Sequence, residues 1–138
     1  MVLKWTGLAL RNQAPEHPGE PTGGGSGLKV LDPEEGLRLA AGKADLATDM
    51  LGMLLAGLAT DRQAIRQARD AGEQHSLIER VHRLHGATRY CGVPQLRAAC
   101  QRSETLLKQN DPAARGALDE LDAAIVRLAN EAAHIRVN

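Results

Sequence analysis

Helix stop signals followed within a few residues by helix start signals divide this sequence after residue 31. Asp32-Pro33 combines an N-cap acceptor with a proline at the first helical position, as is typical of a helix N-terminus. Gly42 and Gly72 are typical of the residue just past a helix C-terminus. Gly92 with Pro94, and then the Asn-Asp-Pro of residues 110–112, repeat this stop and start. These signals predict a short helix over 33–41 and four long ones: 43–71, 73–91, Pro94 to the 110–112 break, and from there to about Arg136.

The connections between these predicted helices are only a few residues long. Short connections force consecutive helices to lie side by side and antiparallel. The apolar residues are almost all Leu, Ala, Ile, Val and Met, with no Phe, one Trp and one Tyr, a composition that favours helices over strands. We therefore predict an all-α fold, an antiparallel up-down-up-down four-helix bundle with the short N-terminal helix capping one end.

The first thirty residues differ in character from the rest. They contain Pro15, Pro18 and Pro21 and then the Gly-Gly-Gly-Ser-Gly run of residues 23–27, which is typical of a flexible linker. A chain of 138 residues is long enough for one domain with a tail. We predict a flexible N-terminal connector over residues 1–30 and one helical domain over residues 31–138.

The charge balance and the cysteine content indicate which partners the protein can bind and in which cellular compartment it is expected. Seventeen acidic and seventeen basic residues give a formal net charge of zero, which argues against binding to nucleic acid or to an anionic membrane surface. No apolar run approaches the roughly 20 residues of a membrane span, and the N-terminus lacks a signal-peptide pattern. Cys91 and Cys100 show no CxxC spacing, so we expect reduced thiols in or near the core. We expect a monomeric, cytoplasmic domain without direct membrane contact.

His82 is the residue whose setting points most clearly to chemistry. On a helix at 100° per residue it lies well off the apolar face, which is formed by Leu77, Val81, Leu84 and Thr88. Gly86, one turn later, costs the helix roughly 1 kcal/mol relative to alanine but leaves the approach to the imidazole clear. An alternative role for Gly86 is close contact between two helices. An exposed imidazole beside a bare helical surface suits a nitrogen that accepts and donates a phosphoryl group.

A carboxylate and several arginines are expected near His82. Counting from the Gly92 turn, Ser103 or Glu104 on the next helix lies level with His82, and Glu104 can accept a hydrogen bond from its Nδ1–H. Lys108 follows one turn beyond on the same face. Residues 80–102 include no acid and five arginines, Arg80, Arg83, Arg89, Arg97 and Arg102. This clustering predicts a locally positive surface suited to phosphate oxygens.

The segment His82-Arg-Leu-His-Gly-Ala, with Gly92 ten residues and Glu104 twenty-two residues after His82, resembles the motif of the histidine-containing phosphotransfer (Hpt) domain family. That motif reads roughly His-x-Leu-Lys-Gly-[Ser/Ala], followed by a Gly that ends the helix. The resemblance covers about Leu31 to Ile135, and the Cys91-Gly-Val-Pro94 turn looks most similar to the Hpt domains of GacS/BarA-type hybrid sensor kinases. The opening segment is similar to the connector after a receiver domain in such kinases.

The resemblance implies a role for each matching residue. His82 is the phosphoacceptor, and Glu104 takes the place of a Gln or Glu hydrogen-bonded to its ring. His85 occupies the position usually held by a lysine that contacts phosphate, a departure that supplies a donor but no fixed charge. The other implied residues are Gly86 for clearance, Arg89 and Lys108 as site support, and Ile78 and Arg83 for receiver docking.

The implied function is that of a phosphorelay intermediate. A receiver-domain aspartyl phosphate, with Mg²⁺ bound in the receiver, donates its phosphoryl group to Nε2 of His82, and the receiver of a response regulator then takes it onto its own aspartate. The domain itself is expected to need no cofactor and to hydrolyse no ATP, since it contains no Gly-rich nucleotide loop. It would be the C-terminal cytoplasmic part of a kinase anchored in the inner membrane.

Two other functions stay open at this point. A helical adaptor bundle needs no chemistry at His82. A metal-binding bundle could use His82 and His85, and Glu79 adds the Glu-x-x-His spacing of such sites, although no second copy occurs on another predicted helix. The hypotheses differ in what must surround His82: a clear approach for phosphotransfer, further ligands for a metal, and nothing in particular for an adaptor.

Overall fold

A computed structural model describes residues 27–137, so most of the predicted connector, residues 1–26, lies outside the described residues. Within residues 27–137 the fold is all-helical and contains no strand. The helices are α2 (Pro33–Leu39), α3 (Ala44–Asp70), α4 (Gln74–Thr88), α5 (Pro94–Lys108) and α6 (Ala114–Val137). The all-α prediction and the order of one short and four long helices are therefore confirmed for this part of the chain.

The predicted stop and start residues act as expected at most helix ends. The Asp32 side chain caps α2 by accepting a hydrogen bond from the Glu35 N–H at 3.1 Å, and Pro33 is the first helical residue. Gly42 and Gly72 adopt φ values of +81° and +68°, the left-handed conformation that ends a helix at little cost for glycine. Asn110 has a φ of +55° between α5 and α6, where asparagine is tolerated.

Two helices end earlier than predicted, and Gly92 has a different role from the one expected. α2 ends at Leu39 rather than residue 41, and α4 ends at Thr88 rather than residue 91. Gly92 follows a turn and packs against the start of α2, where the Asp32 N–H donates to the Gly92 carbonyl at 2.7 Å. A Cβ on Gly92 would lie 2.0 Å from the Asp32 carbonyl oxygen. Glycine is needed there for close backbone approach, and not as a helix C-terminal residue.

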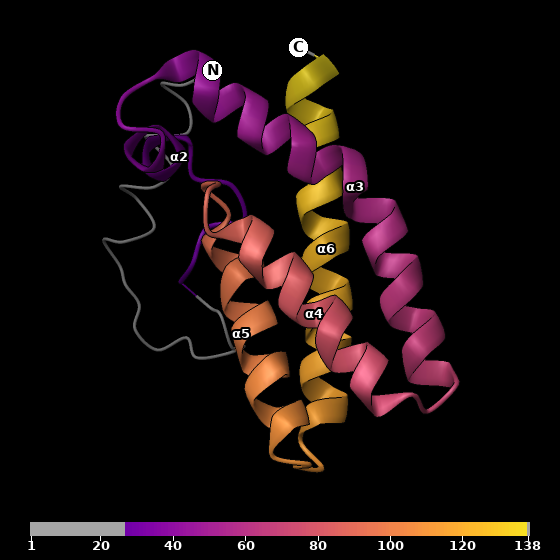
Figure 1. The fold of residues 1–138 in the computed structure, drawn as a ribbon. Helices are drawn as coiled ribbons and strands as arrows, with labels where there is room; N and C mark the ends of the chain where they lie inside the picture. The colour runs from indigo at the N-terminus through magenta and orange to yellow at the C-terminus, as the bar shows by residue number, and fades with distance from the viewer. Residues whose placement is uncertain (1–26, 138) are drawn as a thin grey trace.

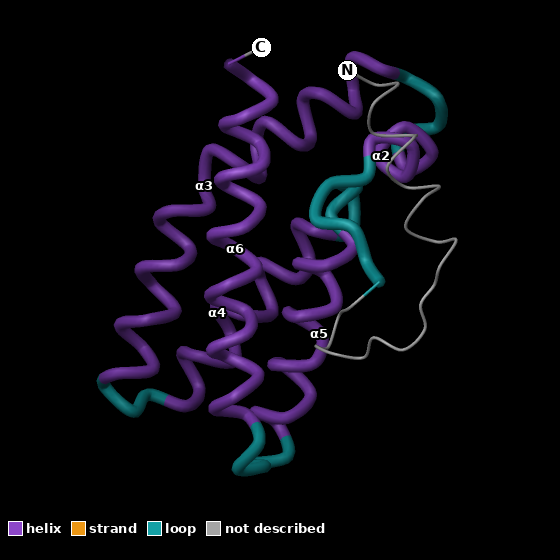
Figure 2. Tube along the Cα trace, turned by 180° about the vertical axis from the view of Figure 1, so that it is seen from behind, coloured by secondary structure: helices purple, strands orange, loops and turns teal. Residues whose placement is uncertain are grey.

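The helices pack in sequence, each against the next, and α3 also contacts α6. Figure 1 shows that α3, α4, α5 and α6 run in alternating directions, as their short connections require. α3 and α6, with 27 and 24 residues, are longer than α4 and α5, with 15 each. Their extra length extends beyond the α4–α5 turn, and α2 lies at this end beside that turn (Figures 1 and 2).

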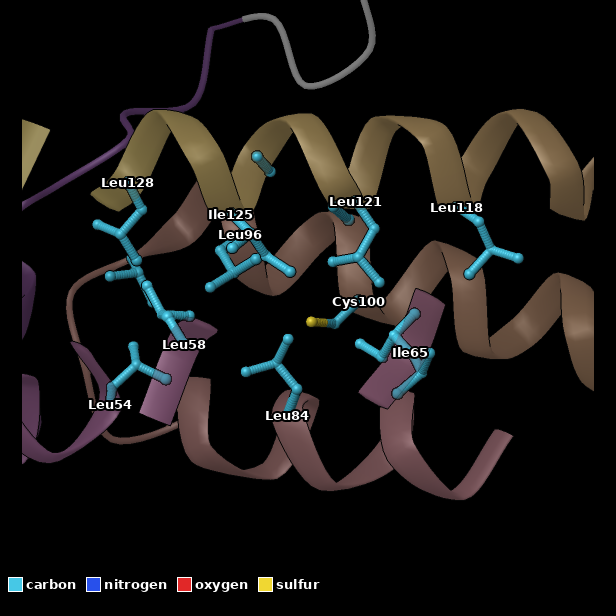
Figure 3. Packing of buried hydrophobic residues seen from close by; sticks show 14 of the residues in the cluster. Leu54, Leu58, Ile65, Leu84, Leu96, Cys100, Leu118, Leu121, Ile125 and Leu128 are labelled. Atoms are coloured by element: carbon cyan, nitrogen blue, oxygen red, sulfur yellow. The ribbon is translucent and has the colours of Figure 1, made fainter. Parts of the chain in front are cut away.

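The core is built from leucine, isoleucine and alanine contributed by all four long helices. Leu84, Leu96, Leu121 and Leu128 are almost completely buried. Figure 3 shows Leu84, Leu96 and Leu121 around Cys100, with Leu128 farther along the core on the side of Leu58. Cys91 and Cys100 are both buried free thiols, as expected, and burial raises the pKa of each. Leu46 and Met53 of α3 are exposed, the latter at 64%. They share a face of the helix that is turned away from the buried Leu54 and Leu58.

Arg97 links α2 and α5 to the end of α4. One guanidinium nitrogen donates to the carbonyls of Thr88 and Cys91, each at 3.1 Å, and another donates to a Glu35 carboxylate oxygen at 2.6 Å. The first pair of bonds ties the last residue of α4 and the following turn to α5, at carbonyls that also accept the backbone N–H groups of Cys91 and Val93. Arg97 is therefore half-buried and paired, and the prediction that it adds to a positive surface around His82 is wrong.

No helix within residues 27–137 combines the length and the apolar character that crossing a bilayer requires.

The close contact at Gly92 predicts a large stability difference between two glycine substitutions. Gly92→Ala should destabilise the domain by roughly 1–3 kcal/mol, since α2 must move away from the turn. Gly52→Ala, in the exposed middle of α3 with open space around it, should stabilise it by roughly 0.5–1 kcal/mol. Urea unfolding followed by circular dichroism measures both. Equal stability of the Gly92 variant and the wild type would contradict the packing role.

Candidate functional site

Helix α4 has the buried apolar face that the sequence predicts, and it carries His82 outside that face. Its four buried residues are those expected from the helical spacing, Leu77, Val81, Leu84 and Thr88. His82 points away from them, and its side chain is 63% exposed. This separation follows from the sequence alone, because burial of the apolar stripe fixes the rotation of the helix about its axis. The imidazole of His82 is accessible to a partner molecule.

Glu104 on α5 lies level with His82, as the count from the α4–α5 turn predicted. Its side chain is 9% exposed, and its Oε2 atom lies 2.6 Å from Nδ1 of His82. A carboxylate can only accept, so Nδ1 of His82 carries the hydrogen of this bond. In the neutral ring the lone pair then resides on Nε2. His82 therefore has an exposed imidazole ring, and its Nε2 atom, which carries the lone pair, lies on the side of the ring away from Glu104.

The same carboxylate has two further partners. Nδ1 of His85 lies 3.0 Å from the Oε1 atom of Glu104, and Nζ of Lys108 lies 2.9 Å from its Oε2 atom. The His85 ring is largely buried, whereas the Lys108 side chain is more than half exposed. A buried carboxylate is costly unless hydrogen-bonded, and here donors from α4 and α5 satisfy both of its oxygens.

These contacts keep Glu104 ionised. Burial by itself raises the pKa of the Glu104 carboxyl, but hydrogen bonds from Lys108, His85 and His82 together outweigh burial and lower the pKa to about 2. At neutral pH the carboxylate is therefore negatively charged. A negative charge at Nδ1 of His82 favours any state in which that ring carries positive charge.

Gly86 leaves the surface beside His82 open. A Cβ placed on Gly86 would meet nothing within 4 Å, so the alternative that Gly86 permits a close helix–helix contact is wrong. Arg83 on α4 and Arg89 just after its C-terminus are exposed, and Ile78 is partly buried against the core cluster. The surface around His82 is thus accessible, with one cationic side chain on the same helix and one directly after it.

Acidic residues from other helices offset part of the positive surface that the sequence predicted. Burial raises the pKa of the Asp61 carboxyl on α3, and the charges of Arg83 and Arg80 oppose this rise. Those two arginines therefore lie within electrostatic range of Asp61, just as Arg97 pairs with Glu35. Residues 80–102 contain no acid, so the local sequence gives no sign of Asp61 or Glu35, which come from distant parts of the chain.

Within the part of the chain that the structure describes, no three His, Cys, Asp or Glu side chains are placed to hold a metal ion together. His82 and His85 both direct Nδ1 to Glu104 instead. The third ligand that the metal-binding hypothesis needs is not found among these residues.

Comparisons with known proteins give a consistent result. The family model of the Hpt domain matches residues 49–131. The sensor histidine kinase GacS of Pseudomonas protegens is 74% identical over 132 residues, which cover 96% of this chain and 14% of that protein. The BarA signal transduction histidine-protein kinase of Escherichia coli K12 is 38% identical over 99 residues, covering 67% of this chain and 11% of BarA. The chain thus spans about one seventh or less of the length of these relatives.

A solved structure supports the same family. The crystal structure of the Hpt domain of a sensor hybrid histidine kinase from Shewanella has a TM-score of 0.71 and 30% identity to this chain. The match covers 77% of this chain and 92% of the Shewanella chain. Because the family model covers more than half of the sequence and a solved Hpt domain shares its fold, this chain belongs to the Hpt domain family.

Proposed function

We propose that this chain is a phosphorelay intermediate in which His82 accepts a phosphoryl group from the aspartate of one receiver domain and passes it to the aspartate of a response regulator receiver. Membership of the Hpt domain family implies the general part of this function, a phosphorelay role in two-component signalling. The donor, the acceptor and the residue assignments are our proposal. The observation that carries it is the exposed His82 ring, hydrogen-bonded through Nδ1 to a buried, ionised Glu104.

The geometry supports a transfer that needs no base on this domain. The Nε2 lone pair of His82 attacks the phosphorus of the receiver's aspartyl phosphate, so that an N–P bond forms as the P–O bond to the aspartate breaks. The released carboxylate stays in the receiver, where Mg²⁺ balances its charge. The His82 ring keeps its Nδ1 proton and becomes positively charged, and Glu104 stabilises that charge. Transfer to the second receiver reverses these steps.

The remaining site residues are assigned supporting roles. Gly86 provides clearance for the incoming phosphoryl group, and Arg89 and Lys108 supply positive charge near it. His85 belongs to the site through Glu104. Ile78 and Arg83 are proposed to contact the docked receiver. We further propose that the helices form an antiparallel up-down-up-down four-helix bundle capped by α2, a description that the alternating helix directions support.

The relatives suggest the protein context. GacS and BarA are sensor kinases several times longer than this chain. We propose that the domain is a cytoplasmic part of such a hybrid kinase anchored in the inner membrane, joined through the connector of residues 1–30. As an isolated domain it is proposed to be monomeric and to bind receiver domains rather than nucleic acid. The adaptor hypothesis lacks a reason for an ionised carboxylate beside an exposed histidine.

Replacing His82 should abolish phosphorylation without affecting the fold. After incubation with a phosphorylated receiver and Mg²⁺, wild-type protein should carry an acid-labile, alkali-stable label that peptide mapping assigns to His82. His82→Gln should carry none, because glutamine has no nucleophilic ring nitrogen. His75→Gln, an exposed histidine on the same helix, is the matched control and should label normally. A label retained by His82→Gln, and lost when His85 is replaced, would show that the acceptor is the other histidine.

Removing the charge of Glu104 should affect both transfer and acid stability. Glu104→Gln should slow transfer roughly 10–100-fold, as is typical of lost partners of functional histidines. Because the folded pKa of about 2 lies below the unfolded value of about 4.3, ionised Glu104 stabilises the fold above about pH 4.3. That contribution, on the order of 3 kcal/mol, is lost as pH falls towards 2. The stability advantage of wild type over Glu104→Gln should shrink in this window, as chemical unfolding at several pH values measures.

Substitution of Gly86 should change stability and rate in opposite directions. Gly86→Ala should stabilise α4 by about 0.5–1 kcal/mol, because the site is open and alanine favours helix. The same change should slow phosphotransfer, and Gly86→Leu should slow it more, since each added carbon obstructs the approach to His82. Thermal unfolding and transfer rates from a phosphorylated receiver measure the two effects. Unchanged rates in both variants would remove the clearance role.

A further inference from the structure

His85 is placed differently from a residue that reaches out to phosphate. Its side chain is only 13% exposed, and its Nδ1 is turned to Oε1 of Glu104 at 3.0 Å. His82, three residues earlier on α4, is exposed and uses the other oxygen of the same carboxylate. His85 therefore occupies the α4–α5 interface, behind the exposed surface that carries His82.

The contacts of Glu104 are divided between its two oxygens. Oε2 accepts from His82 at 2.6 Å and from Lys108 at 2.9 Å, while Oε1 accepts from His85. The last torsion of a glutamate side chain is otherwise broad, so a carboxylate can rotate about it at little cost. A donor on the buried oxygen opposes that rotation, since turning the carboxylate would break the bond to His85 and leave a buried acceptor unsatisfied.

We propose that His85 is a positioning residue. By holding Oε1, it keeps the Glu104 carboxylate in the plane that directs Oε2 to Nδ1 of His82. That hydrogen bond keeps the proton of neutral His82 on Nδ1 and the lone pair on Nε2. The consequence for transfer rests on the proposed function of His82, whereas the effect on its tautomer exists in the unphosphorylated protein.

The tautomer of His82 provides a direct test. In ¹⁵N-labelled protein at a pH where the ring is neutral, the Nδ1 and Nε2 chemical shifts report which nitrogen carries the proton. Wild type should be mainly the Nδ1–H form. His85→Leu removes the donor at similar size and should shift His82 towards the Nε2–H form, in the same direction as Glu104→Ala. His85→Asn places an amide nitrogen where Nδ1 lies and should restore the wild-type tautomer. His75→Leu, at an exposed site on the same helix, should have no effect.

Transfer rates add a second measurement. His85→Leu should reduce the rate from a phosphorylated receiver roughly threefold to tenfold, less than the loss of a direct partner of the histidine, and His85→Asn should stay within about twofold of wild type. If His85→Leu does not fold by circular dichroism, His85→Met replaces it. An unchanged His82 tautomer in a folded apolar variant would overturn the proposal, even if transfer slows, because slowing alone would then indicate contact with phosphate.

The experiments distinguish failure of the proposed phosphorelay function from failure of the proposed positioning role of His85. If wild-type protein accepts no phosphoryl group from any receiver while the tautomer shifts as expected, the phosphorelay function is wrong and the positioning role of His85 stands. If labelling maps to His82 and the tautomer does not depend on residue 85, the function stands and the positioning role is wrong.

Discussion

The buried carboxylate of Glu104 is the interaction on which the site depends. An ionised group with 9% exposure is unfavourable in a helical core unless several donors compensate for lost water. Here the donors come from two helices, His82 and His85 on α4 and Lys108 on α5 itself. The site is therefore a property of the α4–α5 pair, and it exists only while the two helices keep one register. Changes that move either helix should affect the histidine before they expose the core.

That register is set at the turn between the two helices. Gly92 admits the backbone of α2 against the turn, and Arg97 ties the end of α4 to Glu35 on α2. One residue inserted within α5 between Leu96 and Glu104 would rotate Glu104 by about 100° relative to the buried residues before the insertion, and so away from His82. Packing features of the α4–α5 turn, away from His82, thus help to determine whether the histidine has its partner.

Much of this arrangement could be predicted from the sequence because it follows from local rules. Helix number and order follow from the Asp32-Pro33, Gly42, Gly72 and Pro94 signals, and the Glu104 partner of His82 follows from counting back from the turn in an antiparallel pair. The contacts of Arg97 with Glu35 and of Arg83 with Asp61 could not be predicted, because each joins residues that are distant in sequence. The burial of His85 depends on how closely α5 approaches α4, and that distance is not encoded in the period of a single helix.

The segment before α2 is joined to the same turn. The carbonyls of Leu28 and Lys29, which lie in the predicted connector, accept hydrogen bonds from Gln95 at 3.2 and 3.1 Å, and Asp32 is bonded to Gly92. Mechanical force applied along the chain at residue 28 would therefore act first on the N-terminus of α5 and on the turn, and only afterwards on the hydrophobic core. Residues 28–32 are thus attached directly to the pair of helices that carries the histidine and its carboxylate.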